Sequence, residues 1–130
     1  MAKRIRSYVL TETAADDFRA ARRWSLARWG KDRTKTYFEQ LHAAAEYVAA
    51  HQQAIAKRDD LIGNPELAVH AVGEHYLVYA PLDSEQIAVV ALIRQTRDVP
   101  AIVEANSFQI RRQVSAACAA SNRRAKPNVS

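Results

Sequence analysis

The sequence contains one cysteine and no apolar segment long enough to cross a membrane. Cys118 has no second cysteine with which to form an internal disulfide, which is typical of a reducing compartment. No segment approaches the roughly 18 apolar residues of a membrane-spanning helix, and residues 1–10 lack the apolar core and cleavage site of a secretory signal. We therefore expect a cytoplasmic protein with no membrane association.

Common catalytic motifs are also missing. The chain has no glycine-rich phosphate loop, no HExxH, no CxxC and no serine between the glycines of a nucleophile elbow. The four histidines are His42, His51, His70 and His75. We expect structural roles for His42 and His51, the latter capping a helix end. His70 and His75 flank a predicted hairpin without a third ligand nearby, so we predict no metal site and no cofactor.

The 130 residues, 48% hydrophobic and 25% charged, suit one folded domain. The net charge of +5 is concentrated towards the two ends of the chain. Residues 67–103 carry only Arg94 and Arg97 as basic residues, against four acidic ones. A surface that holds a phosphate backbone concentrates lysine and arginine, so direct nucleic-acid binding is not expected. The alternative is that the excess of arginine serves only solubility.

Residues 67–98 form the only long segment rich in β-branched and aromatic residues. Turn residues at 73–74 and 83–85 divide it into three strands, which predicts an antiparallel meander. Alternation places Tyr76, Val78 and Ala80 on one face of the middle strand. In the last strand it places Ile87, Val89, Ala91 and Ile93 opposite Ala88, Val90 and Leu92. Both faces are apolar, so the sheet must be covered twice.

Helical periodicity appears on both sides of the meander. A strand over residues 5–11 is followed by predicted helices over 14–29 and 31–51, with Thr11 or Thr13 as the first cap and Gly30 as the break. These two helices should form an antiparallel hairpin. Residues 52–66 read as a connector, and Pro100 opens a third helix over about 101–120. Residues 121–130 read as a frayed basic end.

These elements predict an α+β fold: an N-terminal strand, an antiparallel helical hairpin, a three-stranded antiparallel meander and a C-terminal helical extension. We divide the chain into a domain over residues 1–103 and an extension with a basic tail over 104–130. The two-helix hairpin can cover only one face of the sheet. The other face is therefore expected to be open to a second polypeptide.

Five side chains on or beside the sheet are candidates for chemistry. Metal-free RNA cleavage needs a base, a cation for the charged transition state and an acid for the leaving oxygen. Two arginines, a histidine and tyrosines supply these groups: Arg94, Arg97, His75, Tyr76 and Tyr79. The structural alternative is that both arginines pair with Asp98, Asp83 or Glu85 at the sheet edge.

The order of elements and the residues at their boundaries resemble the ParE branch of the RelE/ParE superfamily of bacterial toxins. The resemblance covers about residues 6–103. It is carried by Tyr8-Val9-Leu10-Thr11 with Ala14 and Ala15, Trp29-Gly30, Arg58-Asp59, Val72-Gly73, His75-Tyr76-Leu77-Val78-Tyr79 and Arg97-Asp98-Val99-Pro100. It implies a strand, a helical hairpin and an antiparallel sheet, and no cofactor.

The resemblance also implies a partner and a target. Toxins of this kind are neutralised by a cognate antitoxin, acidic and partly disordered, that wraps around them; here we expect it to contact Leu77, Tyr79, Val90 and Leu92. ParE-like members inhibit DNA gyrase, and target contacts would come from Arg94 and Arg97. RelE-like members cut ribosome-bound messenger RNA, for which Arg94, Arg97, His75 and Tyr79 would be catalytic.

RelE-type sites rely on several basic residues across the sheet, whereas this sheet offers only Arg94 and Arg97. The resemblance therefore favours a gyrase inhibitor that is not an enzyme. A metal-independent ribonuclease and an inactive binding module remain alternatives. Relatives often carry basic residues where this chain has Ala68 and Glu74, so a contact there is altered. The tail after residue 104 exceeds the usual family length, and could cover the sheet, extend the target contact or be inert.

Overall fold

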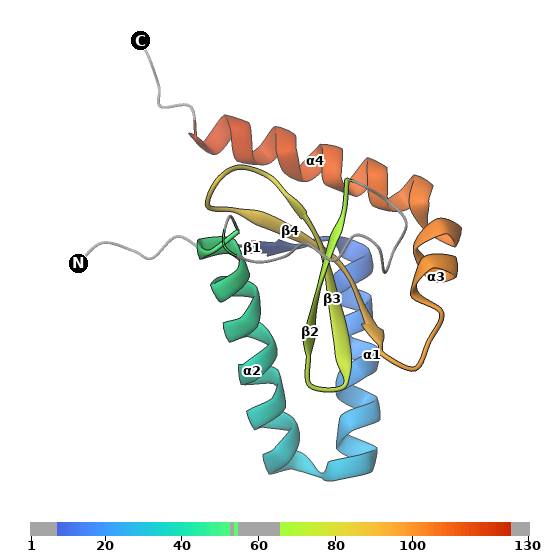
Figure 1. The fold of residues 1–130 in the computed structure, drawn as a ribbon. Coiled ribbons are helices and arrows are strands. Elements are labelled where there is room, and N and C mark those ends of the chain that lie inside the picture. Colours follow the sequence, from blue (N-terminus) through green and yellow to red (C-terminus); the bar gives the residue numbers. More distant parts are fainter. Residues whose placement is uncertain (1–7, 53, 55–65, 126–130) are drawn as a thin grey trace, which may run out of the picture.

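The computed structural model describes residues 8–52, 54 and 66–125, with side chains through residue 120 (Figure 1). The elements follow the predicted α+β order, which is confirmed. They are β1 (Tyr8–Leu10), α1 (Glu12–Trp29), α2 (Lys31–Ala50), β2 (Ala68–Val72), β3 (His75–Pro81), β4 (Ile87–Arg94), α3 (Val99–Ala105) and α4 (Ser107–Ala125). Most of the predicted connector, including Arg58-Asp59, lies outside the described residues.

The four strands form one mixed sheet in the order β1-β4-β3-β2. The meander is antiparallel as predicted, but β1 runs parallel to β4, with Tyr8 paired to Ile87. The implication of a fully antiparallel sheet is therefore wrong. Parallel neighbours cannot be joined by a tight turn, and here the connection includes the α1–α2 hairpin as well as β2 and β3.

The ends of the first two helices match the sequence prediction. The hydroxyl of Thr11 accepts a hydrogen bond from the backbone N–H of Ala14 at 3.2 Å and so caps α1. Gly30 separates α1 from α2 with a φ of +88°, a conformation that glycine adopts without a steric penalty. At the end of α2, Nδ1 of His51 lies 2.9 Å from the carbonyl oxygen of Tyr47, in the predicted capping role.

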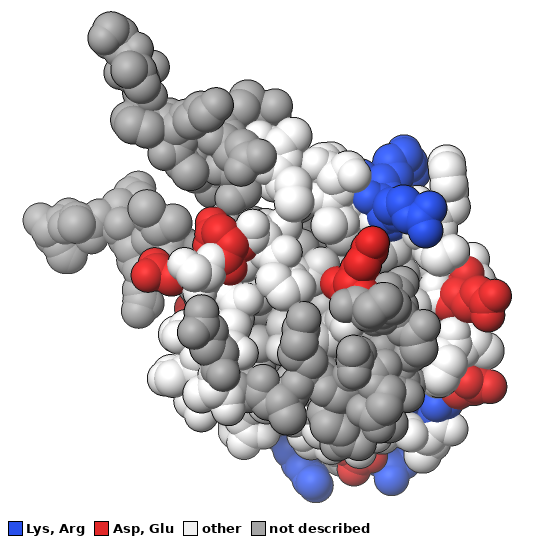
Figure 2. Space-filling model, turned by 45° about the horizontal axis from the view of Figure 1, so that its top comes forward, with Lys and Arg blue, Asp and Glu red and all other residues white. Residues whose placement is uncertain are grey.

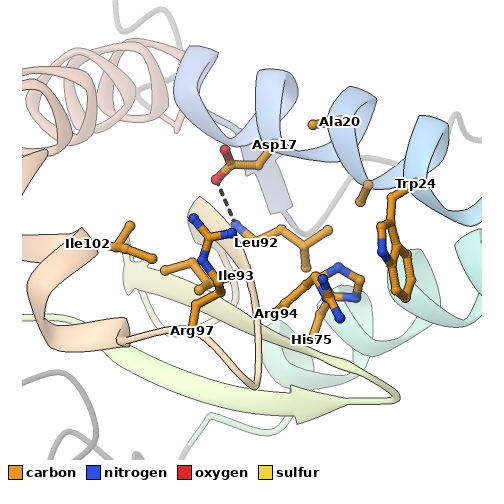
Figure 3. A pocket seen from close by; sticks show the side chains of 10 residues that line it. Asp17, Ala20, Trp24, His75, Leu92, Ile93, Arg94, Arg97 and Ile102 are labelled. Carbon is orange, nitrogen blue, oxygen red and sulfur yellow. Dashed lines mark hydrogen bonds between the residues drawn. The ribbon is translucent and has the colours of Figure 1, made fainter.

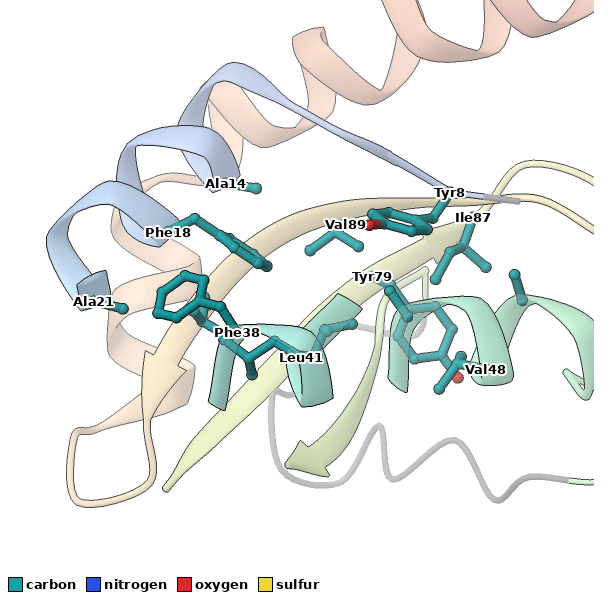
Figure 4. Packing of buried hydrophobic residues seen from close by; sticks show 14 of the residues in the cluster. Tyr8, Ala14, Phe18, Ala21, Phe38, Leu41, Val48, Tyr79, Ile87 and Val89 are labelled. Atoms are coloured by element: carbon teal, nitrogen blue, oxygen red, sulfur yellow. The ribbon is translucent and has the colours of Figure 1, made fainter. Parts of the chain in front are cut away.

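The α1–α2 hairpin covers one face of the sheet and encloses the larger core (Figure 4). This core joins the apolar stripes of both helices to the side chains of the sheet face beneath them. Its buried members are Tyr8, Ala14, Phe18, Ala21, Tyr37, Phe38, Leu41, Ala45, Val48, Ala49, Ala68, Leu77, Tyr79, Ile87, Val89 and Leu92. The apolar side chains of both helices therefore belong to the core.

The second face of the sheet is covered by α3 and α4. A separate core cluster lies there, made of Leu67, Val69, Val78, Ala80, Val90, Ala91, Ile93, Val99, Val103 and Ile110. In Figure 1, α4 crosses this side of the sheet. The expectation of a sheet face open to another polypeptide is therefore wrong. The physical reason is that the C-terminal helices supply the second apolar layer themselves.

The C-terminal segment is two helices, not the single helix that we predicted. Asp98 caps α3, its Oδ1 accepting from the N–H of Ala101 at 3.2 Å. Asn106 ends α3, because its side-chain amide donates to the carbonyl of Ile102 at 2.8 Å. Helix α4 continues through Ala125, so the prediction of a frayed end is wrong for residues 121–125.

The domain boundary that we placed between residues 103 and 104 falls inside α3 and stays a prediction.

A bulge in β4 changes which side chains face which core. Val78 pairs with Ala91 and Tyr79 pairs with Val89, so Val90 is an extra residue in β4. After it, Ala91 and Ile93 face α3 and α4 while Leu92 faces the helical hairpin. The predicted alternation is therefore correct for β3 but wrong for the second half of β4.

No helix in the described part of the chain is long and apolar enough to cross a membrane.

The side chains predicted to contact an antitoxin lie in the two cores. Leu77, Tyr79 and Leu92 pack beneath the α1–α2 hairpin, and Val90 packs beneath α3 and α4. Each is at most 6% exposed. A partner could therefore touch them only after a covering helix has moved.

Candidate functional site

A cleft lies between α1, the C-terminal end of β4 and the start of α3 (Figure 3). Its volume is about 390 Å³. Helix α1 projects several side chains into it, and the end of β4 with the following turn supplies both arginines of the sheet region. The lining residues are Asp17, Ala20, Ala21, Trp24, His75, Leu92, Ile93, Arg94, Arg97 and Ile102.

Arg94 is the last residue of β4 and pairs in register with His75, the first residue of β3. Its guanidinium carbon lies 4.6 Å from the ring centroid of Trp24, so the cation stacks on the indole. The Nε atom of Arg94 is buried and has no hydrogen-bond partner among the described residues. A cation is thus held in place by an aromatic ring and keeps an unused donor.

His75 is 2% exposed and is fixed by two aromatic residues. Its Nδ1 lies 2.7 Å from the hydroxyl oxygen of Tyr37, and its ring meets the indole of Trp24 edge to face at 5.8 Å. Burial, with a smaller contribution from the charge of Arg94, lowers the pKa of His75 to about 4; the carboxylate of Glu74 opposes this shift. The imidazole is therefore neutral at neutral pH.

Tyr37 reaches this position because the first hairpin leaves room for its ring. The backbone N–H of Glu74 donates to the Tyr37 oxygen at 3.0 Å, and burial raises the pKa of this hydroxyl. Gly73 has a φ of +56°, and a Cβ placed there would lie 2.4 Å from Cε1 of Tyr37. Glycine is therefore required at this turn by both its backbone conformation and the contact.

Asp17 closes the other end of the cleft and holds α1 against β4. The pairing of β4 with β1 ends at Val89, opposite Leu10. Further along β4, the backbone N–H of Leu92 donates a hydrogen bond to Oδ2 of Asp17 at 3.0 Å (Figure 3). Burial raises the pKa of this carboxyl group, and the hydrogen bond from Leu92 opposes the rise; the charge of Asp16 adds to it. Asp17 thus accepts a backbone hydrogen bond of β4 that a neighbouring strand would otherwise accept.

Arg97 is exposed at the rim of the cleft. Neither it nor Arg94 forms an ion pair with a carboxylate of the described residues. The predicted pairing with Asp98, Asp83 or Glu85 is therefore absent from the described part of the chain. Asp98 caps α3 instead, and Oδ1 of Asp83 accepts the N–H of Glu85 at 2.8 Å.

The structure brings together three of the four residues proposed for RNA cleavage. Arg94, Arg97 and His75 line the cleft, while Tyr79 is buried among the side chains beneath the α1–α2 hairpin. Tyr76 packs against the second core, on the opposite face of the sheet. Among the described residues, no group of three histidine, cysteine, aspartate or glutamate side chains is placed to hold a metal ion.

Sequence reasoning missed the part of this site that α1 contributes. The buried residues of α1 are Ala14, Phe18, Ala21 and Ser25, and Trp24 is not among them. A large aromatic residue outside the buried face of a helix is the sequence feature that could have pointed to a contact at Trp24. Asp17 lies near the start of α1, where an acidic residue is common, so its position gives no sign of a contact with β4. The cleft can bind a ligand of negative charge, because it presents two unpaired guanidinium groups beside apolar walls.

The comparisons with known proteins agree with this architecture. The family model described as "ParE toxin of type II toxin-antitoxin system, parDE" matches residues 8–99. A solved structure titled "Chromosomal ParDE TA system from P. aeruginosa" contains a chain that is similar in fold, with a TM-score of 0.57. The identity is 13%, and the alignment covers 68% of this chain and 94% of the other. No curated protein matches the chain. Because the family model matches more than half of the sequence, the chain belongs to the ParE toxin family of type II toxin–antitoxin systems.

Proposed function

We propose that this chain inhibits DNA gyrase by binding to it, acts in the cytoplasm and is neutralised by a cognate antitoxin. The observation that carries the proposal is the cleft, which resembles a binding site more than a catalytic one. Its two basic groups, Arg94 and Arg97, are cations that keep their protons at any physiological pH. Membership of the ParE family adds support for a gyrase inhibitor over a nuclease.

We propose that Arg94 and Arg97 contact the target. Both line the same cleft, and both lack an internal ion pair among the described residues, so their donors are available to another molecule. The Trp24 ring holds Arg94 in one orientation, which lowers the entropy lost when a ligand binds.

A ribosome-dependent ribonuclease is the second candidate, favoured by the meeting of Arg94, Arg97 and His75 in one cleft. Proton transfer is the weak point of this candidate. His75 has a pKa of about 4 and an Nδ1 already bonded to Tyr37, so it is a poor general acid at neutral pH. Tyr79 lies in the core and cannot replace it without rearrangement.

Neutralisation by an acidic, partly disordered antitoxin fits the net charge of +5. Figure 2 shows described basic side chains grouped at the upper right and along the lower edge, with acidic side chains between and beside them, so charge alone does not define a single docking surface. We propose that Leu77, Tyr79, Val90 and Leu92 become antitoxin contacts only when a covering helix is displaced. Moving α4 would uncover Val90, whereas Leu77, Tyr79 and Leu92 lie beneath the α1–α2 hairpin. Among the described side chains of α4 only Ile110 is buried, so few side chains hold this helix against the sheet.

A supercoiling assay tests the proposal. Purified protein is titrated into gyrase with relaxed plasmid, and supercoiling should fall with rising toxin concentration. Undisturbed gyrase at a large molar excess of toxin contradicts the proposal. A parallel reaction with ribosomes and messenger RNA tests the second candidate, since cuts that Arg97→Ala abolishes would establish a ribonuclease. Growth arrest on expression without antitoxin would exclude an inactive binding module.

A further inference from the structure

We propose that the cleft beside Trp24 binds an acidic side chain of the target protein, with Arg94 as the ligand of its carboxylate. This inference rests on the proposed function and names the chemistry of the target contact. It also assigns a role to Trp24, which holds the arginine, and to the apolar residues Ile93 and Ile102 on the cleft wall.

The guanidinium group of Arg94 is oriented for this task. Its guanidinium carbon lies 4.6 Å from the centroid of the Trp24 ring, and a guanidinium group that stacks on an aromatic face keeps the N–H groups at its edge for other partners. The edge includes Nε, which is buried and unpartnered. Because Nε is covered by protein, the two terminal NH₂ groups are the donors that a ligand can approach from the cleft. A carboxylate matches the planar edge of a guanidinium group with two parallel hydrogen bonds.

The walls of the cleft favour a side chain from a folded protein. Leu92, Ile93 and Ile102 lie beside the arginine and are buried or half-buried. Apolar surroundings lower the local dielectric constant and strengthen a hydrogen-bonded ion pair. They also offer contacts to the methylene groups of a glutamate and to an apolar neighbour of that residue. Arg97 at the rim adds a second, more solvent-screened positive charge.

A nucleic acid fits the same cleft poorly. The Trp24 ring already has the guanidinium groups of Arg94 and Arg28 over it, at 4.6 and 5.3 Å, so it is not a free platform for a nucleobase. Asp17 places a carboxyl group in the cleft, which opposes a polyphosphate with its several negative charges more strongly than a single carboxylate. No lysine of the described residues lines the cleft. These features select one discrete carboxylate over a charged backbone.

The test uses Trp24 as an internal reporter. In a Trp29→Phe variant, Trp24 is the only tryptophan, and its fluorescence should change when a ligand reaches Arg94. The probe is the tripeptide acetyl-Leu-Glu-Leu-amide, and its matched control is acetyl-Leu-Gln-Leu-amide. Inorganic phosphate and a short single-stranded oligonucleotide are titrated separately. We expect the glutamate peptide to bind at least about tenfold more tightly than the glutamine peptide, since a charge-assisted pair is lost in the latter.

Substitutions assign the signal to the cleft. Arg94→Gln should weaken binding of the glutamate peptide at least about tenfold, and Arg94→Lys should weaken it less, because a point charge remains without the planar edge. Arg33→Gln is the matched control, since Arg33 stacks on Trp29 at 4.7 Å outside the cleft; it is made with both tryptophans present and read by calorimetry. Thermal unfolding of each variant checks that it is folded.

Equal binding of the two peptides, tighter binding of the oligonucleotide, or an unchanged affinity in folded Arg94→Gln would overturn the inference. The same variants are then compared in the supercoiling assay. If the glutamate peptide binds but wild-type protein leaves gyrase undisturbed, the gyrase proposal fails and the carboxylate chemistry of the cleft stands. If gyrase is inhibited equally by wild type and Arg94→Gln, the gyrase proposal stands and the inference fails.

Discussion

The hydroxyl oxygen of Tyr37 lies 2.7 Å from Nδ1 of His75, and this hydrogen bond joins α2 to the first residue of β3. The same oxygen accepts the N–H of Glu74, so one side chain on α2 fixes the first hairpin of the sheet. His75 in turn supports Trp24, on which Arg94 is stacked. The orientation of the cleft arginine therefore depends on a polar contact beneath it.

The buried imidazole should make stability depend on pH. The folded pKa of His75 is about 4, below the usual 6.5, so the unfolded chain binds more protons between these two values. Stability should fall as the pH drops from 6.5 to 4, by up to about 3 kcal/mol. Urea unfolding at several pH values measures this. In His75→Gln the dependence should largely disappear, whereas His51→Gln, at an exposed position, should retain it.

Gly73 should tolerate substitution less well than Gly30. Alanine at either site adopts an unfavourable positive φ, at a cost of roughly 1–3 kcal/mol. At Gly73 the new Cβ would also lie 2.4 Å from the Tyr37 ring, and overpacking adds roughly 1–3 kcal/mol. At Gly30 no atom of the described residues lies within 4 Å of the new Cβ. Chemical denaturation should rank Gly73→Ala as the less stable variant, and the reverse order would contradict this account of the turn.

Asp17 should stabilise the junction of α1 and β4 through its acceptor oxygen. Asp17→Ala leaves the N–H of Leu92 without this partner and should cost about 1–3 kcal/mol, whereas Asp17→Asn keeps an acceptor and should cost less. Burial raises the pKa of Asp17 in the folded protein above the ordinary value of 3.8, so the folded state binds more protons than the unfolded chain between these two pKa values. The free energy of unfolding should therefore decrease as the pH rises through this range. Asn at this position removes that dependence, which paired unfolding curves of both proteins would reveal.

The docking of α4 can be tested by two substitutions on the same helix. Ile110 is 5% exposed and packs in the second core, so Ile110→Ala should cost about 2–5 kcal/mol. Phe108 is 75% exposed, and Phe108→Ala should change stability by no more than about 0.5 kcal/mol. Thermal or urea unfolding of both variants gives the comparison. Equal, small effects would show that α4 does not cover the sheet in solution.

The second face of the sheet is covered by helices of the chain itself. An unoccupied apolar face was expected to receive the antitoxin, and α3 with α4 fills that place. Family membership therefore rests on the match over residues 8–99, which includes none of α4. The role of an antitoxin stays a proposal.

Local sequence determined the elements of this protein. The periodicity of residues 12–50, the Thr11 cap, Gly30 and the turn residues at 73–74 act through neighbours in the chain, so helices and strands could be predicted from them. The same reasoning placed Arg94 and His75 on neighbouring strands of the meander, although their direct pairing depends on the bulge at Val90. Arg97, a candidate from the sequence, also lies at the cleft.

Tertiary structure decided the rest. The extra residue Val90 in β4 reversed the faces of the side chains after it, and no local pattern marks it. The parallel pairing of β1, the closure of the second sheet face by α4 and the meeting of Trp24 with Arg94 all join residues far apart in the chain. Such contacts depend on how the surfaces of the formed helices and strands pack against one another. The residues adjacent in sequence do not determine that packing.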